Sequence, residues 1–210
     1  MKFLRYIIFF IIVFNGLNFV SFAQNTKEII NSMSVKDKLW AVKNYSSLKK
    51  AQKISLNVLI VMDSLNKENF LGGNKEGGVF DAFRHIYWMY SLSIEIGEKK
   101  ARRVGEIYEK YNKYLFEKKG VLGYDSVGMA MDLFNNELGI YLSNEQIADS
   151  LIFNKIVDII HLGKAKVVKK NTLQESLDKN NNPIPEEIWR KYWVNDRILV
   201  NSNYIPIGKE

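Results

Sequence analysis

Residues 77–97, with the sequence GGVFDAFRHIYWMYSLSIEIG, constrain the fold more than any other segment of the chain. Two glycines precede an aromatic-rich helical pattern over residues 80–96, and Gly97 follows it. Apolar residues fall on most faces of this helix, which predicts that other elements cover it on several sides. The rest of the chain is therefore expected to fold around this segment.

The same helix carries polar residues that need partners. Asp81, His85 and Trp88 lie at positions i, i+4 and i+7 and share one face, and Arg84 lies beside them. A buried charge without a partner is strongly destabilising, so we expect each to be paired. The candidate anions are Asp81, Glu106, Glu109 and Asp132. The simplest arrangement pairs Arg84 or His85 with a carboxylate from a neighbouring helix.

A second polar stripe lies on a helix expected over residues 125–142. Asp132, Asn135, Asn136 and Gly139 occupy positions i, i+3, i+4 and i+7 of this otherwise apolar segment. Asn and Asp are poor residues for a helix interior, so three of them on one stripe indicate a buried hydrogen-bond network. The glycine would let a neighbouring helix approach closely. We predict that this stripe docks onto the helix of His85.

The remaining pattern predicts a mainly α fold, a compact orthogonal bundle of about five to six helices over residues 34–163. A chain of 210 residues is long enough for one such domain. A capping box at Ser34 and Asp37 should open the first helix, and Ser143 with Gln146 should open the last one before residue 163. Further helices are expected over residues 46–65 and 99–118. Residues 164–210 form an irregular extension, with a short helix over 186–192 and a short hairpin as one alternative.

The first 23 residues are typical of a secretory signal peptide. Lys2 and Arg5 precede an apolar run over residues 6–13, and small residues at Ser21 and Ala23 mark a cleavage site. The run is shorter than the roughly 20 residues that a membrane-spanning helix needs, which favours cleavage over the alternative of a retained anchor. The mature chain is then exported to the periplasm or the extracellular space, with a loose segment over residues 24–33 and no further membrane span.

Composition excludes several classes of site. The chain has no cysteine, which excludes disulfides, zinc–thiolate sites and thiol nucleophiles. The 30 Lys and Arg against 23 Asp and Glu give a net charge of +7, but these residues are spread along the chain. No compact motif of arginine and aromatic residues accompanies them, so there is no strong nucleic-acid signal.

Three interpretations of the polar residues remain open. The first is a structural network that fixes the register of the helices. The second takes His85 as a general base oriented by Asp132 or Asp81, with Arg84, Asn135 or Asn136 stabilising negative charge. The third is a metal site. It has Asp81, His85, Glu109 and Asp132 as ligands of a divalent cation of intermediate hardness.

Three motifs resemble an uncharacterised bacterial domain family of exported proteins. G-x-x-D-A-F-R-H-x-x-W stands at Gly78–Trp88, a Gly-x-x-Tyr-Glu step at Gly105–Glu109, and M-D-x-x-N-N-x-x-G at Met131–Gly139. The resemblance covers residues 75–145 and implies export, but no activity. Many members have a histidine where this chain has Tyr108.

The run Arg84-His85-Ile86-Tyr87 is also similar to part of the catalytic helix of small secreted phospholipases A2. Ile86 stands where those enzymes have the aspartate that holds calcium. Two hypotheses follow. The first is an exported protein of unknown function whose His, Arg, Asp and Asn cluster serves structure or ligand binding. The alternative is a secreted hydrolase directed at lipids or phosphoesters.

Overall fold

The computed structural model describes residues 31–73 and 76–206. The predicted signal peptide and most of the loose segment after it lie outside these residues. The described chain forms seven α-helices: Val35–Lys43 (α3), Tyr45–Lys67 (α4), Val79–Ile96 (α5), Glu98–Lys119 (α6), Ser126–Leu142 (α7), Ile152–His161 (α8) and Glu186–Trp189 (α9). Two short 3₁₀ turns, Phe70–Gly73 (η2) and Asp149–Leu151 (η3), and two strands, Lys166–Val168 (β1) and Leu199–Asn201 (β2), complete it. None of its helices is long and apolar enough to cross a bilayer.

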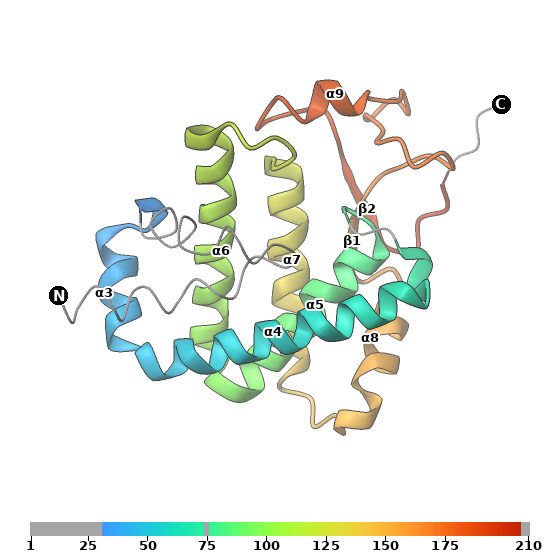
Figure 1. Ribbon diagram of the computed structural model, residues 1–210. Coiled ribbons are helices and arrows are strands. Elements are labelled where there is room, and N and C mark those ends of the chain that lie inside the picture. Colours follow the sequence, from blue (N-terminus) through green and yellow to red (C-terminus); the bar gives the residue numbers. More distant parts are fainter. Residues whose placement is uncertain (1–30, 74–75, 207–210) are drawn as a thin grey trace.

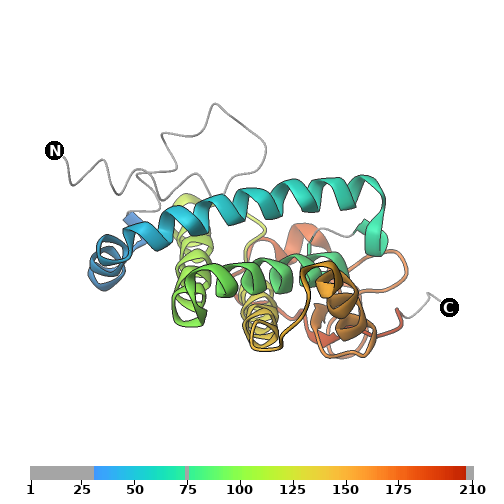
Figure 2. The same cartoon turned by 90° about the horizontal axis from the view of Figure 1, so that it is seen from below.

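The helices cross steeply, as expected for an orthogonal bundle. α6 and α7 stand side by side in Figure 1, and α4 lies across them. In Figure 2 the same two helices are seen nearly end-on, whereas α4 and α5 run lengthwise across the picture. α5 packs against α4, α6, α7 and α8, so the aromatic-rich segment is the centre of the fold. Its side chains Phe83, Ile86, Met89 and Leu92 are completely buried.

Two glycines let the central helices approach closely. A Cβ atom at Gly139 of α7 would collide with the backbone carbonyl of Ile86 in α5. A Cβ atom at Gly105 of α6 would lie 3.1 Å from Nδ2 of Asn136 and 3.3 Å from Cε of Met89. Both positions therefore need glycine for packing, and the close approach brings the polar residues of α5 and α7 into contact.

The helix starts follow the sequence signals in two places and depart from them in a third. The predicted capping box forms, because Ser34 Oγ accepts a hydrogen bond from the Asp37 N–H and Asp37 reaches back to Ser34. Asp125 caps α7 by accepting the Gly128 N–H at 2.6 Å. The box predicted at Ser143 is wrong, because α8 begins only at Ile152 and the Ser143 hydroxyl donates to the Ile140 carbonyl.

Periodicity predicts apolar stripes on two helices: Val127, Met131, Phe134, Leu138 and Tyr141 on one, and Ile54, Leu56, Leu59, Ile60 and Met62 on the other. Met131 and Met62 are buried as predicted, but parts of both stripes are exposed. On α7 the expected apolar residues Phe134 and Tyr141 are exposed, whereas the polar residues Asn135 and Asn136 are buried. On α4 Leu56 and Ile60 are exposed, and Leu48, Ala51, Val58 and Met62 form the buried face. Hydrophobic periodicity gives the type of element, but the face that is covered depends on the neighbouring helices.

The C-terminal extension packs back on the helices. β1 and β2 pair antiparallel with Val167 opposite Val200, and β1 also contacts α7. The predicted small antiparallel pairing in this segment is confirmed, although more than thirty residues separate the paired positions of the two strands. Shorter antiparallel bridges join Lys170 to Ser176 and Leu177 to Pro183. The expected helix over residues 186–192 shortens to α9, with Pro185 at its N-cap.

Candidate functional site

The two predicted polar stripes meet at the interface of α5 and α7. Nε2 of His85 lies 3.3 Å from Oδ1 of Asp132, and Nδ1 of His85 lies 3.1 Å from Oδ1 of Asn136. His85 and Asn136 are buried, whereas Asp132 keeps 16% of its side chain exposed. The docking predicted from the sequence is therefore confirmed, and a histidine is held between an amide and a carboxylate.

The contact with Asn136 determines the state of the His85 ring. With the Asn136 amide oriented as in the structure, its oxygen accepts, and the matching tautomer of His85 carries its proton on Nδ1. Nε2 of the neutral ring then presents a lone pair toward Asp132. Oδ1 of Asp132 receives no hydrogen bond, although less than 1 Å² of its surface is accessible. Nε2 can accept from Nη2 of Arg84, 3.1 Å away, whereas Oδ1 of Asp132 has no donor, and a proton or a cation beside this oxygen would satisfy it.

Asp81 and Arg84 complete the first turn of α5 beside the histidine. Oδ2 of Asp81 accepts the Gly77 N–H at 2.7 Å, and Oδ1 pairs with Arg84. Oδ1 also lies 3.7 Å from Nε2 of His85. Nη2 of Arg84 is 3.1 Å from the same Nε2, and 35% of the Arg84 side chain is exposed. Arg84 is thus paired within its own helix, and it is His85 that meets a carboxylate of a neighbouring helix, Asp132 of α7.

Glu109 brings a third carboxyl group to the site from α6. It is 1% exposed, Nδ2 of Asn112 lies 3.4 Å from its Oε2, and its Oε1 has no hydrogen-bond partner. Burial raises the pKa of Glu109 to about 8, with Asp81 adding to the rise and Asn112 and Arg84 opposing it. Burial, followed by the charges of Glu109 and Asp81, also raises the pKa of Asp132 well above its ordinary value.

The same surroundings change the pKa values of the two basic groups, His85 and Arg84. Burial and the adjacent Arg84 charge lower the pKa of His85 to about 4, against the opposing effects of Asp81 and Asn136, so the ring is neutral near pH 7. For Arg84, burial acts to lower the pKa, but the charges of Asp81 and its neighbours outweigh this and raise it. Asp81, Glu109 and Asp132 thus crowd around a neutral imidazole and Arg84, while Arg190 and Arg197 line the same cleft. A cation bound among these carboxyl groups would favour their ionised forms.

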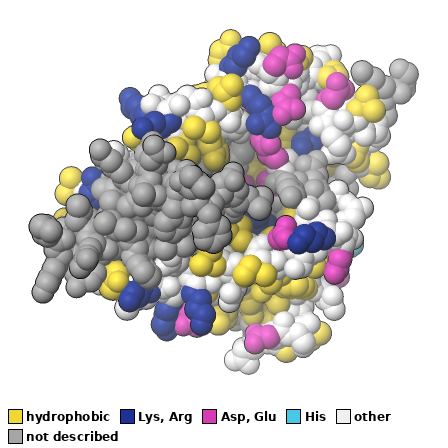
Figure 3. Space-filling view, in the orientation of Figure 1, with side chains coloured by type: hydrophobic (Ala, Val, Ile, Leu, Met, Phe, Trp, Pro, Cys, Tyr) yellow, Lys and Arg dark blue, Asp and Glu magenta, His cyan; other side chains and the backbone are white. Residues whose placement is uncertain are grey.

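An open cleft of about 420 Å³ gives access to the carboxyl groups. Asp81, Glu109 and Asp132 line it together with Arg84 and Tyr108. The C-terminal extension supplies another wall, with Val168, Arg190, Trp193 and Arg197. On the face seen in Figure 3, acidic and basic side chains gather beneath α9. Asp132, with 16% of its side chain exposed, is the carboxyl group that a small molecule in the cleft can reach most readily.

Three of the four predicted metal ligands converge. One ligand atom from each of Asp81, His85 and Asp132 lies within 4.8 Å of the others. If each ligand atom lies about 2.0–2.2 Å from a shared ion, the ligand atoms are themselves only a few ångströms from one another, as these three atoms are. Glu109 lines the same cleft but does not belong to this close group. One nitrogen and two oxygens suit a divalent ion such as Mn²⁺ or Zn²⁺.

Other predicted site residues have structural partners. Asn135 is completely buried, and its amide exchanges two hydrogen bonds with the backbone of Lys166, at 2.9 and 3.0 Å. Asn135 thus attaches β1 to α7 and takes no part in the cluster. Trp88 donates its Nε1–H to Oγ of Ser55 at 2.8 Å. Its ring stands edge-on to His85, with 6.2 Å between the centroids.

Sequence reasoning missed several residues around the site. Arg190 and Arg197 come from a segment that we expected to be irregular, and no helical period linked them to the cleft. Arg197 is 3% exposed at its side chain, pairs with Asp125 and lies 3.6 Å above the ring of Trp189. The recurrence of tryptophan and arginine in residues 189–197 was the available signal.

The model of one protein family matches residues 35–164, and its description is Domain of unknown function (DUF6973). No curated protein matches the chain. No solved structure matches it either. The match includes α3 to α8 with the residues of the cluster, whereas Arg190 and Arg197 lie beyond it.

Proposed function

The chain belongs to the DUF6973 family, and we propose that it is a hydrolase that uses a divalent cation to cleave an ester bond. Asp81, His85 and Asp132 would bind the cation. The observation that carries the proposal is the contact between Nε2 of His85 and Oδ1 of Asp132. These two atoms lie 3.3 Å apart, neither has a proton to offer the other when Asp132 is ionised, and Asp132 opens onto the cleft.

A purely hydrogen-bonded cluster leaves too many atoms without partners. Oδ1 of Asp132, Oε1 of Glu109 and Nδ2 of Asn136 are all buried and unbonded. Most buried polar atoms in native proteins have a partner, so the two carboxyl oxygens call for a proton or a cation, whereas Nδ2 of Asn136 is a donor and needs an acceptor. The excess of carboxyl groups around a neutral imidazole favours a cation as that ligand.

A bound divalent cation lowers the pKa of a coordinated water and polarises the bond to be cleaved. The cluster would position that water, and Glu109, whose Oε1 accepts no hydrogen bond, would take its proton in the ionised form. Burial raises the pKa of Glu109 to about 8, and a cation beside it would oppose this rise. The oxygen of the water forms the new bond to the ester centre. The bond to the leaving oxygen breaks, and this oxygen takes up the proton from Glu109. Hydrolysis of the ester then balances without any further reactant.

Arg84 would have two positions. In the structure it contacts Nε2 of His85 and Oδ1 of Asp81, which are two of the proposed ligand atoms. An ion there would displace the guanidinium toward the cleft, which it already lines. Arg84 would then be placed to bind the negative charge that develops on the substrate.

The contacts of Arg84 also favour a second candidate, a structural network without a bound ion. In that case Arg84 is the permanent partner of Asp81 and His85, and the cluster serves to fix α5 against α7. The two candidates differ in the effect of removing Arg84. A metal site would bind its ion more tightly, whereas a structural network would lose stability and bind no ion.

The test is titration of the metal-free protein with Mn²⁺ and Zn²⁺ by calorimetry, followed by assays on aryl carboxylic esters and aryl phosphodiesters. We expect one ion per chain, ester cleavage that depends on it, and loss of both in His85→Gln. Glu137→Gln is a matched control, because Glu137 lies on α7 but pairs with Arg102 at the exposed surface. A folded wild-type protein that binds neither ion would overturn the proposal.

We also propose that the protein is exported, on the basis of Lys2, Arg5, the apolar run after them and the small residues up to Ala23. N-terminal sequencing of the protein recovered from the periplasm or the medium tests this. A mature chain that begins at Gln24 supports the proposal, and a chain that retains Met1 inside the cell overturns it.

A further inference from the structure

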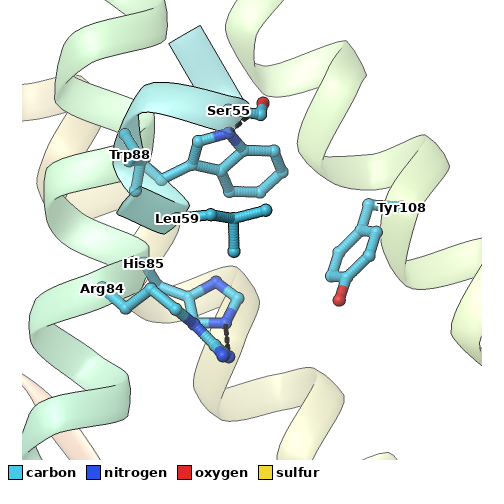
Figure 4. A pocket seen from close by; sticks show the side chains of 7 residues that line it. Ser55, Leu59, Arg84, His85, Trp88 and Tyr108 are labelled. Atoms are coloured by element: carbon cyan, nitrogen blue, oxygen red, sulfur yellow. Dashed lines mark hydrogen bonds between the residues drawn. The ribbon is translucent and has the colours of Figure 1, made fainter. Parts of the chain in front are cut away.

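A second cavity reaches the histidine from the side of α4. This slot has a volume of about 70 Å³, and its lining comes from three helices. α4 provides Ser55, Val58 and Leu59, α5 provides Arg84, His85 and Trp88, and α6 provides Tyr108. In Figure 4, Leu59 lies between the rings of Trp88 and His85, and Tyr108 stands across from them. The slot therefore ends at the residues of the proposed active site.

The wall of the slot presents a mainly apolar surface to an occupant. The polar atoms of Trp88 and Ser55 are turned to each other, since Trp88 Nε1 donates to Ser55 Oγ at 2.8 Å. The Ser55 hydroxyl in turn donates to the Ala51 carbonyl at 2.9 Å. The ring of Trp88 meets that of Tyr108 edge-on, with 5.7 Å between the centroids. An apolar group is thus the occupant that such a wall favours.

The slot and the cleft are neighbouring parts of one site. Arg84 and Tyr108 line both cavities, and His85 lines the slot while Asp81 and Asp132 line the cleft. The proposed ion would therefore lie between an apolar recess and a polar opening. A bound molecule would have an apolar end on one side of the reacting bond and a polar end on the other.

We infer that the substrate is a carboxylic ester with a short acyl chain, which the slot between Val58, Leu59, Trp88 and Tyr108 binds. This inference rests on the proposed hydrolase function. The acyl chain occupies the slot, the carbonyl lies at Arg84 and the ion, and the alcohol leaves through the cleft. At about 10–15 Å³ for each water-sized group, the slot accommodates only a short chain.

The test measures binding of the product-like carboxylates acetate, butanoate, hexanoate and decanoate by calorimetry, with and without Mn²⁺. Each methylene that enters the slot should raise affinity about fourfold, and the gain should stop once the slot is full. Leu59→Phe fills the slot and should abolish the gain while acetate binding is kept. Leu59→Ala enlarges the slot and should extend the gain to longer chains. Leu56→Phe, at an exposed position of α4, is the matched control.

The outcomes separate the two proposals. A chain-length gain in protein that binds no Mn²⁺ overturns the hydrolase proposal but keeps the apolar subsite. Equal affinities for acetate and hexanoate, or the same gain in Leu59→Phe as in the wild type, overturn the subsite. Melting temperatures of the Leu59 variants show whether they fold, and if Leu59→Phe does not, Leu59→Ala decides. Cleavage of aryl phosphodiesters without cleavage of acyl esters also overturns the inference.

Discussion

Asp125, the N-cap of α7, and Asp132 within this helix line the same cleft but differ in their hydrogen-bond partners. Asp125 is 3% exposed and fully bonded: Oδ1 accepts the Gly128 N–H, and Oδ2 accepts from Arg197 and from Nδ2 of Asn195. Asp132 is partly open to the cleft, and its Oδ1 accepts nothing. The first is a completed ion pair, and the second is an incomplete one. Burial of a charge alone therefore does not mark a functional site; what distinguishes Asp132 is a carboxyl oxygen without a donor beside the histidine.

Two other buried acids of the described chain, Asp37 and Glu109, differ from each other in the same way. Asp37 of α3 is buried like Asp125 and has the side chains of Ser34, Arg103 and Lys110 around it. Glu109 resembles Asp132, since each keeps one unbonded oxygen and has a raised pKa. Asp37 and Asp125 hold helices in place with complete partners, whereas Asp132 and Glu109 each keep an unbonded oxygen; Asp125, Asp132 and Glu109 all line the cleft.

The largest effect is expected at the completed pair. Asp125→Asn leaves the buried guanidinium of Arg197 without a countercharge and should lower the free energy of unfolding by about 3–5 kcal/mol. Urea denaturation followed by circular dichroism measures this. A loss below about 1 kcal/mol, the usual worth of an exposed pair, would show that Asp125 is no more structural than a surface acid.

Asp132→Asn should affect metal binding more than stability, in contrast to Asp125→Asn. Because it removes one of three crowded carboxyl groups, the metal-free protein should keep its stability or gain some. Mn²⁺ affinity should fall by about 100-fold, at the upper end of the losses seen when partners of metal ligands are removed. Calorimetry and thermal melting of the same samples measure the two quantities. If the Asp132→Asn variant unfolds more easily and its Mn²⁺ affinity is unchanged, Asp132 has a structural role like that of Asp125.

Arg84→Gln distinguishes a competitor of the ion from a permanent partner. Removal of a positive charge that contacts two proposed ligand atoms should raise Mn²⁺ affinity by roughly tenfold, the effect of about 1.4 kcal/mol of relieved repulsion. Arg102→Gln, which removes an exposed arginine paired with Glu137, should leave the affinity unchanged. If Mn²⁺ affinity does not change in Arg84→Gln and the melting temperature falls, the structural network is the better description.

The smallest effect is expected in how the stabilising contribution of the Asp37 carboxylate depends on pH. Burial acts to raise its pKa, but the Ser34 hydrogen bond and the charges of Arg103 and Lys110 outweigh this and hold the pKa below 3.8. A lowered pKa means that the ionised carboxylate stabilises the fold above the unfolded pKa of about 4. Its contribution, about 1 kcal/mol, should fade as the pH drops below that value. Urea denaturation of wild type and Asp37→Asn at pH 7, 5 and 3 should show a difference that shrinks only at pH 3.

Much of the helical framework was predictable from local patterns. Periodicity located α4 to α7, and side chains that compete with the backbone marked the starts at Ser34 and Asp125. The polar stripe of Asp132 and Asn136 predicted its contact with His85, because buried polar groups must find one another. Periodicity did not reveal that Phe134 and Tyr141 are exposed, since this depends on which neighbours cover α7.

The features that could not be predicted from the sequence depend on contacts between distant segments. β1 pairs with β2 from more than thirty residues away, and no local signal links the two strands. The slot arises where Leu59 of α4 meets Trp88 of α5 and Tyr108 of α6, and each residue alone is an ordinary apolar position. Arg197 reaches the cleft only because the extension folds back onto Asp125. Such sites become visible only in three dimensions.

The most direct measurement is an anomalous difference map from crystals soaked in Mn²⁺. We expect one peak within about 2.0–2.3 Å of Nε2 of His85 and of a carboxylate oxygen from each of Asp81 and Asp132, with Arg84 turned away into the cleft. Crystals that show no peak at these atoms at saturating Mn²⁺, with Arg84 still on Nε2 and Asp81, would contradict the account.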